Sequence, residues 1–254
     1  MTLRLPSLLI LSVLLVTGCK HPQAPAAKSP SYNPAPAVNP ATAGEISGIV
    51  HFDGPAPPRV PIDMSADPAC NKPGLPNLTE QIIVNDGALA NVYVYIKSGA
   101  PSYTAIPDAP PVNLDQKGCR YIPHVLAIHQ GGAVAFLNSD ATTHNIHTLP
   151  TKPGNASVDI SEPPDSAARV ETFPTPEVML PVRCNNHPWM SAFINIAPNP
   201  WYAVSNTDGT FRITGVPPGT YTLAAVQEKL GEKDIQITVK PKSVADASFT
   251  FTAK

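Results

Sequence analysis

The sequence carries little charge of either sign. Only 14% of its residues are Asp, Glu, Lys or Arg, and the formal net charge is -2. Proteins that bind a polyanion neutralise its phosphates with clustered Lys and Arg, and this chain has no run of such residues. We therefore expect no nucleic acid among its partners.

The chain also lacks long stretches of helical periodicity. Its apolar runs are short and are separated by Gly, Pro and Asp, and proline is abundant at 32 residues. One run places Val92, Val94 and Ile96 on one face and Tyr93 and Tyr95 on the other, and alternating β-branched and aromatic residues are typical of a strand. The pattern predicts an all-β fold.

No apolar run is long enough to span a bilayer. The run from Leu8 to Val16 follows Arg4 and is too short for a membrane helix, which is typical of a signal peptide. It ends in Val16-Thr17-Gly18-Cys19, which resembles a bacterial lipobox. We expect residues 1–19 to be a lipoprotein signal peptide, with Cys19 lipidated and the protein anchored to a membrane of the bacterial cell envelope, facing the periplasm or the cell surface.

Residues 20–44 contain Pro, Ala, Ser and Asn and almost no large apolar side chain. Such a composition cannot bury enough surface to offset the entropy lost on ordering. We expect a disordered tether that holds the folded part away from the membrane.

A short stretch late in the chain places soft metal ligands at regular spacing. Cys184, His187 and Met190 stand at positions i, i+3 and i+6. Sulfur donors with imidazole suit copper, and one Cys, two His and a weakly bound Met make up a blue-copper ligand set. The second His must come from another strand, and His144 is the candidate, with His147 as the alternative.

The block from about Val112 to Ala197 resembles the cupredoxin, or blue-copper, family. Residues 119–138 are similar to the opening pair of strands, and His144-Asn145-Ile146 is similar to the first ligand segment. Cys184-x-x-His187-Pro188-Trp189-Met190 is similar to the tight ligand loop of the amicyanin-like members. The resemblance implies a cupredoxin domain at 111–198.

The resemblance also implies roles for individual residues. It implies one copper ion with four protein ligands: His144, Cys184, His187 and Met190. Asn145 would tie the two ligand segments together, and Pro188 would also lie just outside the ligands. The second His of this family reaches the surface, so His187 is expected there, with Trp189 in an apolar docking patch for a redox protein partner. Residues 150–168 depart from the family and are expected to be a long polar loop that covers the metal or docks a partner.

The remaining segments resemble a carboxypeptidase-regulatory-like, or transthyretin-like, β-sandwich. The matching motifs stand on both sides of the copper block: Gly48-Ile49-Val50 and Val92 to Tyr95 before it, and Asp208 to Phe211 and Pro218 to Leu223 after it. We therefore expect two β-sandwich domains. One is discontinuous, at 45–110 and 199–254, with the cupredoxin domain inserted. The alternative is two consecutive domains, with 44–110 as an N-terminal lobe of the cupredoxin.

The four cysteines have a bearing on the metal site. With Cys19 lipidated, three remain, and in an oxidising compartment an odd thiol needs an explanation. If Cys70 and Cys119 form a disulfide, Cys184 is left as the metal thiolate. Two free thiols, or a second metal site of Cys119 with His124, are the alternatives.

These observations predict a copper-binding, one-electron carrier of the cell envelope. No Ser-His-Asp order, carboxylate pair or Gly-rich phosphate loop stands out. Four protein ligands would leave copper no open position for a substrate, so we expect no enzyme. The alternatives are a copper-handling or sensing module, and a structural lipoprotein without redox turnover.

Overall fold

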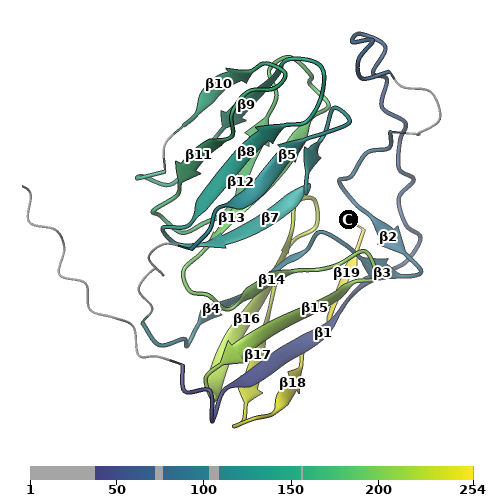
Figure 1. Cartoon of the computed structure of the whole chain (residues 1–254). Coiled ribbons are helices and arrows are strands. Elements are labelled where there is room, and N and C mark those ends of the chain that lie inside the picture. Colours follow the sequence, from purple (N-terminus) through teal and green to yellow (C-terminus); the bar gives the residue numbers. More distant parts are fainter. Residues whose placement is uncertain (1–37, 72–76, 103–108, 156, 254) are drawn as a thin grey trace, which may run out of the picture. The chain divides into compact units, whose positions relative to one another are not determined.

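The computed structural model describes residues 38–71, 77–102, 109–155 and 157–253. Its regular elements are all β-strands and no helix occurs in these ranges, so the predicted all-β fold is confirmed (Figure 1). None of the described residues forms a helix that is long and apolar enough to cross a membrane. The predicted signal peptide, Cys19 and most of the predicted tether lie outside the described residues.

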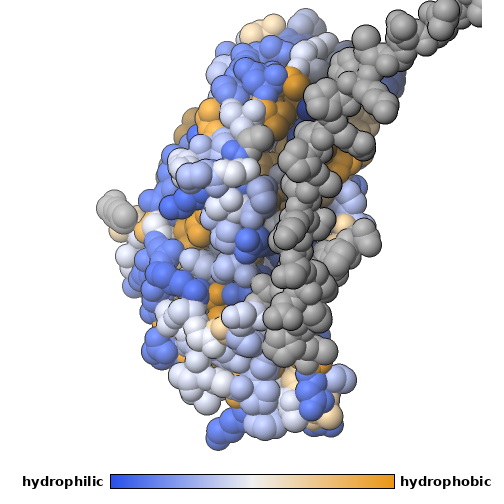
Figure 2. Space-filling view, turned by 90° about the vertical axis from the view of Figure 1, so that its left-hand side faces the viewer, coloured by the Kyte–Doolittle hydropathy of each residue, from blue (hydrophilic) through white to orange (hydrophobic). Residues whose placement is uncertain are grey.

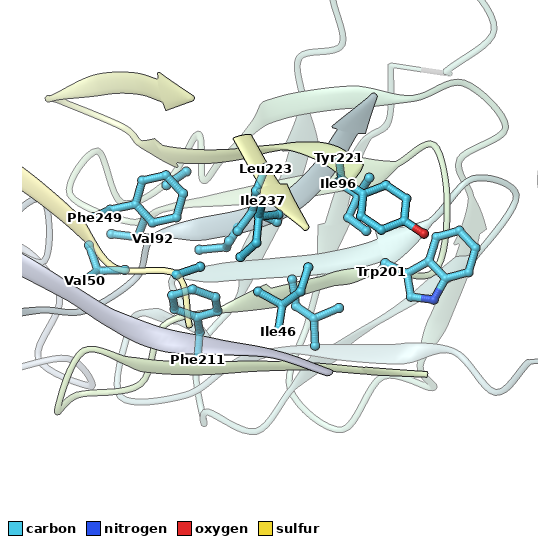
Figure 3. Packing of buried hydrophobic residues seen from close by; sticks show 14 of the residues in the cluster. Ile46, Val50, Val92, Ile96, Trp201, Phe211, Tyr221, Leu223, Ile237 and Phe249 are labelled. Carbon is cyan, nitrogen blue, oxygen red and sulfur yellow. The ribbon is translucent and has the colours of Figure 1, made fainter. Parts of the chain in front are cut away.

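Two of the four sheets combine strands from both ends of the described chain. In the six-stranded sheet, β1 (Gly44–Asp53) pairs with four strands: β15 (Thr210–Val216), β18 (Val244–Asp246), β19 (Phe249–Thr252) and β3 (Ala88–Leu89). The sixth strand, β2 (Val84–Asn85), pairs with β3. The facing sheet has the order β14 (Tyr202–Val204), β4 (Tyr93–Ser98), β16 (Gly219–Gln227), β17 (Gly231–Val239). Buried side chains of both sheets, including Ile46, Phe211, Leu223 and Phe249, pack together in one core (Figure 3).

The other two sheets are built from the middle of the chain. One has the order β10 (Asp159–Glu162), β9 (His144–Thr148), β12 (Glu177–Arg183), β13 (Ser191–Ala197), β7 (Val125–His129). The other has the order β11 (Arg169–Thr172), β8 (Ala133–Asn138), β5 (Val112–Gln116), β6 (Tyr121–Ile122). Their inward side chains, among them Phe136, Ile146, Leu180 and Ile194, form a second core. The molecule therefore contains β-sandwiches, as the sequence predicted.

Alternation of side chains decides which face of a strand enters a core. In β15, Phe211 and Ile213 are buried, while Arg212 and Thr214, which alternate with them, are exposed. On the face of the molecule seen in Figure 2, hydrophobic residues lie as separate spots among hydrophilic ones. Burial of the apolar faces between paired sheets accounts for this surface.

The segment between β1 and β2 packs against the second core. Ile62, Met64 and Cys70 contact this core, although they precede β2 in the chain. The resemblance of the flanking motifs assigned the whole of 45–110 to the first sandwich. This packing brings residues 62–71 over the loop that carries Cys184 and His187.

Residues 150–168 are not the continuous polar loop that we expected. Asp159–Glu162 form β10, an edge strand antiparallel to β9, with Ile160 opposite Ile146 and Glu162 opposite His144. The open backbone edge of β9 offers hydrogen-bond partners to any extended segment alongside, and the half-buried Ile160 packs against the second core. The segment therefore extends the sheet that carries His144.

Gly48 lies where β1 passes close to the chain before β19. A Cβ at this position would stand 1.7 Å from the carbonyl oxygen of Ala247, whose amide donates to Ser47 O at 2.9 Å. We expect Gly48→Ala to lower the free energy of unfolding by about 3 kcal/mol, because the backbone must move to relieve the overlap. Urea denaturation would measure this, with Ser47→Ala as the control. Equal midpoints for the two variants would contradict the prediction.

Glu177 begins β12, and its buried carboxylate closes the loop between β9 and β10. It accepts hydrogen bonds from the Thr151 amide at 2.6 Å, the Thr151 hydroxyl at 2.9 Å and Asn155 Nδ2 at 2.9 Å. Burial raises the pKa of Glu177, but these donors outweigh it and hold the pKa below its usual value.

The lowered pKa predicts a pH-dependent contribution to stability. A carboxyl whose pKa is lower in the folded protein than in the unfolded chain stabilises the fold at pH values above its unfolded pKa of about 4.3. This stabilisation is lost as the pH falls through the pKa of the folded protein. We expect Glu177→Gln to lower the free energy of unfolding by about 1–3 kcal/mol at pH 7 and by less at pH 3. Denaturant titrations at both pH values would test this, with the exposed Asp246→Asn as control. A loss for Glu177→Gln that is the same at both pH values would refute the expectation.

Candidate metal centre

The two ligand segments meet at one end of a sheet. His144 is the first residue of β9, and Cys184 directly follows the last residue of β12. β9 and β12 are antiparallel neighbours, with Val182 opposite Thr148 and Arg183 opposite His147. The start of one strand therefore lies beside the end of the other.

Three soft or borderline donor atoms converge in a buried space. Nδ1 of His144 and Nδ1 of His187 are 3.0 Å apart, and Cys184 Sγ is 3.6 Å from His187 Nδ1. Donor atoms of all three residues lie within 4.8 Å of one another. His144 is fully buried, and Cys184 and His187 are each 4% exposed. One thiol and two imidazoles are thus gathered away from bulk solvent, as a metal site requires.

Met190 lies in the same short loop and in the same core. Its side chain is 1% exposed and packs with the buried residues around Cys184. The Met190 amide donates to His187 O at 2.9 Å, and Met190 O accepts from the Cys184 amide at 3.3 Å. These two bonds close the loop on itself and fix the backbone from which Cys184, His187 and Met190 project.

His147 stands apart from this cluster. Its Nδ1 is 3.1 Å from Asn185 Oδ1, and its side chain is partly exposed. Side chains of a strand alternate between its two faces, and His147 is three residues after His144 in β9. The two imidazoles therefore point to opposite faces of the sheet. Of the two candidates, the structure places His144 with Cys184 and His187.

The ionisation of Cys184 favours metal binding. Burial raises the pKa of Cys184, but hydrogen bonds with His144, His187 and nearby amides outweigh it and lower the pKa to about 7. Burial likewise lowers the pKa of His144, whereas Asp140 and Cys184 raise it to about 9. A thiol that ionises near neutral pH is readily available as the thiolate that binds metals.

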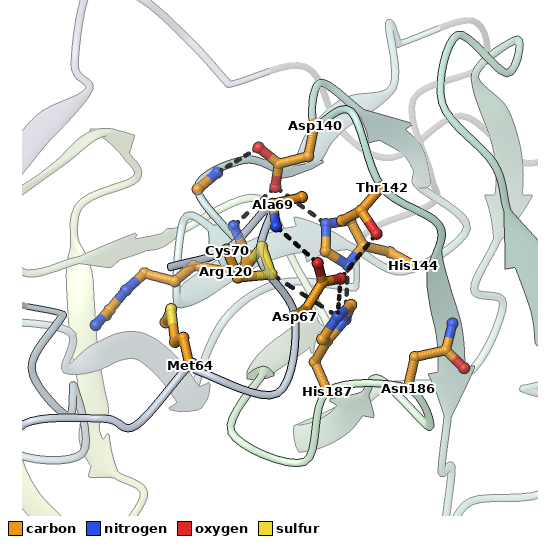
Figure 4. The surroundings of a disulfide bond; sticks show 12 residues. Met64, Asp67, Ala69, Cys70, Arg120, Asp140, Thr142, His144, Asn186 and His187 are labelled. Carbon is orange, nitrogen blue, oxygen red and sulfur yellow. Dashed lines mark hydrogen bonds and ion pairs between the residues drawn. A yellow bond between two sulfur atoms is a disulfide. The ribbon is translucent and has the colours of Figure 1, made fainter. Parts of the chain in front are cut away.

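Each imidazole is held from behind by a carboxylate (Figure 4). Asp140 Oδ2 is 3.0 Å from His144 Nε2, and Asp67 Oδ2 is 3.0 Å from His187 Nε2. The hydrogen bond from His187 lowers the pKa of Asp67. Burial raises the pKa of Asp140, but hydrogen bonds from His144 and from two amides bring it below its usual value. Both carboxylates therefore accept Nε2–H, which leaves each Nδ1 facing the centre.

Sequence reasoning missed both aspartates as part of the site. Asp140 carries a local signal, because it stands four residues before His144. Asp67 has none, because it is 120 residues from His187 in the chain. Only packing of the segment after β1 against the ligand loop brings it there.

The expectation that His187 reaches the surface is wrong. The residues around Asp67 cover it, and Cys70 Sγ lies 3.7 Å from His187 Nε2. Trp189, expected in a docking patch, is only partly exposed. Its Nε1 donates to Cys119 O at 3.1 Å, and its ring centroid is 5.1 Å from that of His187. Pro188 between them is exposed.

Cys70 and Cys119 form a disulfide, as predicted, across a separation of 49 residues with a Cα–Cα distance of 5.5 Å. Cys184 is a free, buried thiol. The alternative of a second metal site with Cys119 and His124 is wrong. Cys119 is consumed in the disulfide, and His124 Nε2 pairs with Glu228 Oε1 at 2.6 Å.

Asn145 connects the two ligand segments as the sequence suggested. Its Oδ1 accepts from the amide of Asn185 at 3.2 Å, next to Cys184. Its Nδ2 donates to Asp159 Oδ1 and to Ile160 O, each at 2.9 Å, which links the same position to β10. The strand that carries His144 and the loop that carries Cys184 are thereby held in register.

Comparisons with known proteins give partial similarity. No family model matches the chain, and no curated protein matches it. Similar solved structures include a copper-containing nitrite reductase from Thermus scotoductus SA-01, at 21% identity, 40% of this chain, 25% of that chain and a TM-score of 0.31. They also include two amicyanin variants in the Cu(I) form, at 22% and 23% identity, each with 41% of this chain, 97% of that chain and a TM-score of 0.31. The chain thus spans a quarter of the nitrite reductase and nearly all of the amicyanins, and these TM-scores assign it to no family.

Proposed function

We propose that this protein is a blue-copper electron carrier of the bacterial cell envelope. The observation that carries the proposal is the convergence of the Cys184 thiol with Nδ1 of His144 and of His187 in a buried space. A thiolate and two imidazoles, with the buried Met190 in the same loop, are the donor types of a blue-copper site. The residues present therefore fit copper.

The protein supplies a rigid and dry setting for these donors. Bound copper would provide one-electron chemistry by alternating between Cu(I) and Cu(II). His144 is fixed on a strand, and the loop from Cys184 to Met190 is closed by its own backbone bonds. Fixed ligands rearrange little between two charge states, which keeps the barrier to electron transfer low. With Met190 as a fourth protein ligand, no position stays open for a substrate, so we propose no enzymatic activity.

The proposed setting is the cell envelope, with Cys19 lipidated and residues 20–44 as a tether. The Cys70–Cys119 disulfide supports this, because disulfides persist in oxidising compartments. The redox protein partner would dock at the face that includes Pro188 and Trp189. Both residues line a surface hollow of about 180 Å³, together with Arg120.

The domain organisation belongs to the same proposal. The two central sheets would form a cupredoxin domain at 111–198. The sheets around β1 and β16 would form a carboxypeptidase-regulatory-like sandwich at 45–110 and 199–254. The mixed origin of its strands, with β1 to β4 before and β14 to β19 after the central sheets, supports an insertion. Domains tolerate such insertions at loops because their termini are often close together.

Spectroscopy of the chain from Lys20 onward, after addition of Cu(II), tests the proposed function. We expect a strong visible thiolate-to-copper band and an EPR spectrum with narrow copper hyperfine splitting. His144→Ala should lose both signals, whereas the matched variant His147→Ala should keep them.

Two other outcomes would lead elsewhere. Copper bound without the visible band would indicate a copper-handling or sensing module, with Cys184 not coordinated. A colourless protein that holds no copper would reject the electron carrier and favour a structural or ligand-binding lipoprotein.

A further inference from the structure

The copper ligands are surrounded by three loops that share a set of hydrogen bonds. Figure 4 shows Asp67, Asp140 and the Cys70 disulfide grouped around His144 and His187. Neither aspartate belongs to the proposed ligand set. Their contacts assign them a separate task.

Asp67 joins its own segment to both ligand segments. Its Oδ1 accepts from the Ala69 amide at 2.8 Å, which fixes the turn in which it lies. Its Oδ2 accepts from the Thr142 hydroxyl at 2.8 Å and lies 3.0 Å from His187 Nε2. Thr142 is two residues before His144, so one carboxylate oxygen bridges the two ligand segments. The side chain is 22% exposed, and little solvent reaches the outer edge of the His187 imidazole.

Asp140 holds the imidazole of His144. Its Oδ1 accepts from the Gly118 amide at 2.8 Å. Its Oδ2 accepts from the Cys119 amide at 2.7 Å and lies 3.0 Å from His144 Nε2. The side chain is 8% exposed. With two amides and one imidazole as donors, the carboxylate has a single well-defined position.

The Cys70–Cys119 disulfide links the surroundings of the two carboxylates. Cys70 is three residues after Asp67, and its amide donates to Asp67 O at 3.0 Å. Its disulfide partner, Cys119, donates its own amide to Asp140. The disulfide therefore holds the turn that carries Asp67 against the turn whose amides bind the Asp140 carboxylate.

We propose that Asp67 and Asp140 are positioning residues, clamped by the Cys70–Cys119 disulfide, that aim the two imidazoles at the copper and lower its reduction potential. A carboxylate that accepts Nε2–H fixes the tautomer and orientation of a metal-bound His and makes it a better donor. Two negative charges one imidazole away from the metal also favour the higher charge of Cu(II), and burial limits their screening. The proposal rests on the proposed copper site.

Asp67→Asn and Asp140→Asn test the proposal in the otherwise unchanged chain from Lys20 onward. Asn keeps the shape and an acceptor oxygen but removes the charge. We expect each variant to favour Cu(I) over Cu(II) about tenfold more than the parent protein, which corresponds to a reduction potential higher by about 59 mV for one electron. Redox titration followed in the visible band measures this.

Asp63→Asn is the matched control. Asp63 lies in the same segment, is exposed, and its Oδ1 accepts only a local bond from the Ser65 amide at 2.9 Å. Its substitution should leave the potential unchanged. Potentials of Asp67→Asn and Asp140→Asn that match Asp63→Asn would overturn the proposal.

A measurement without copper separates this proposal from the proposed function. In the metal-free, ¹⁵N-labelled protein, the Nε2 protons of His144 and His187 should exchange slowly with solvent. Asp67→Ala should speed exchange at His187 more than at His144, and Asp140→Ala should do the reverse. Fast exchange of both protons in the parent protein would reject the carboxylate contacts themselves. Slow exchange in a protein that binds no copper would uphold the positioning of the imidazoles and reject the electron carrier together with the effect on its potential.

Discussion

Replacing Cys184 with Ser should abolish the visible band of the copper-loaded protein. The thiolate is the donor that gives a blue-copper site its colour and its strongest bond, and a serine hydroxyl stays protonated near neutral pH. We expect the affinity for copper to fall by more than the roughly 10- to 100-fold that accompanies loss of a contact to a metal ligand. Competition titration against a chelator would measure the change.

Because Ser is small, a lost band can be attributed to the missing thiolate and not to unfolding. Ser is close in volume to Cys, and Cys184 is a free, buried thiol of the second core. The metal-free variant should therefore melt within a few degrees of the parent protein, which circular dichroism can check. A Cys184→Ser protein that keeps the visible band would show that another sulfur is the donor.

The second large effect is expected from the disulfide. Replacing both Cys70 and Cys119 with Ser should lower the free energy of unfolding by about 4 kcal/mol, the loop-entropy value for a separation near 49 residues. The bond holds the segment around Asp67 against the second core. Among the described residues between β1 and β2, the isolated bridge of Pro61 with Leu78 is the only regular pairing. Guanidinium denaturation of the metal-free protein would measure the loss.

Cys184→Ser is also the control for the disulfide variant, because it removes a thiol without removing a cross-link. A double variant as stable as this control would mean that packing alone holds the segment. If the loss is found, the segment should also open more often. Copper would then transfer to an external chelator faster than in the parent protein, because the outer edge of His187 would be uncovered.

The sequence was informative where a local pattern determines the structure. Alternation identified strands such as β15, in which Phe211 and Ile213 are buried and Arg212 is exposed. The spacing of Cys184, His187 and Met190 named a loop that the structure does close on itself. The cysteine count allowed the Cys70–Cys119 pairing, with two free thiols or a second metal site as the alternatives.

Local patterns failed where the partner is distant. β10 was expected to be loop because Asp159–Glu162 is short and polar, and its strand conformation depends on the free edge of β9. Glu228 begins a charge-rich stretch, Glu228 to Lys233, whose composition suits a solvated turn, but its side chain is 6% exposed and pairs with His124. In both cases the neighbour that decides the conformation is not adjacent in the chain.

The sequence by itself determined the all-β class, the disulfide as one possibility and the types of donor atom available to a metal. These follow from side-chain chemistry and from the two-residue period of a strand, which are properties of neighbouring residues. Only the tertiary structure placed His144 rather than His147 beside Cys184, and only it buried His187 beneath Asp67. The reason is physical: a hydrogen bond between residues 120 apart exists only after the sheets have packed and the disulfide has closed.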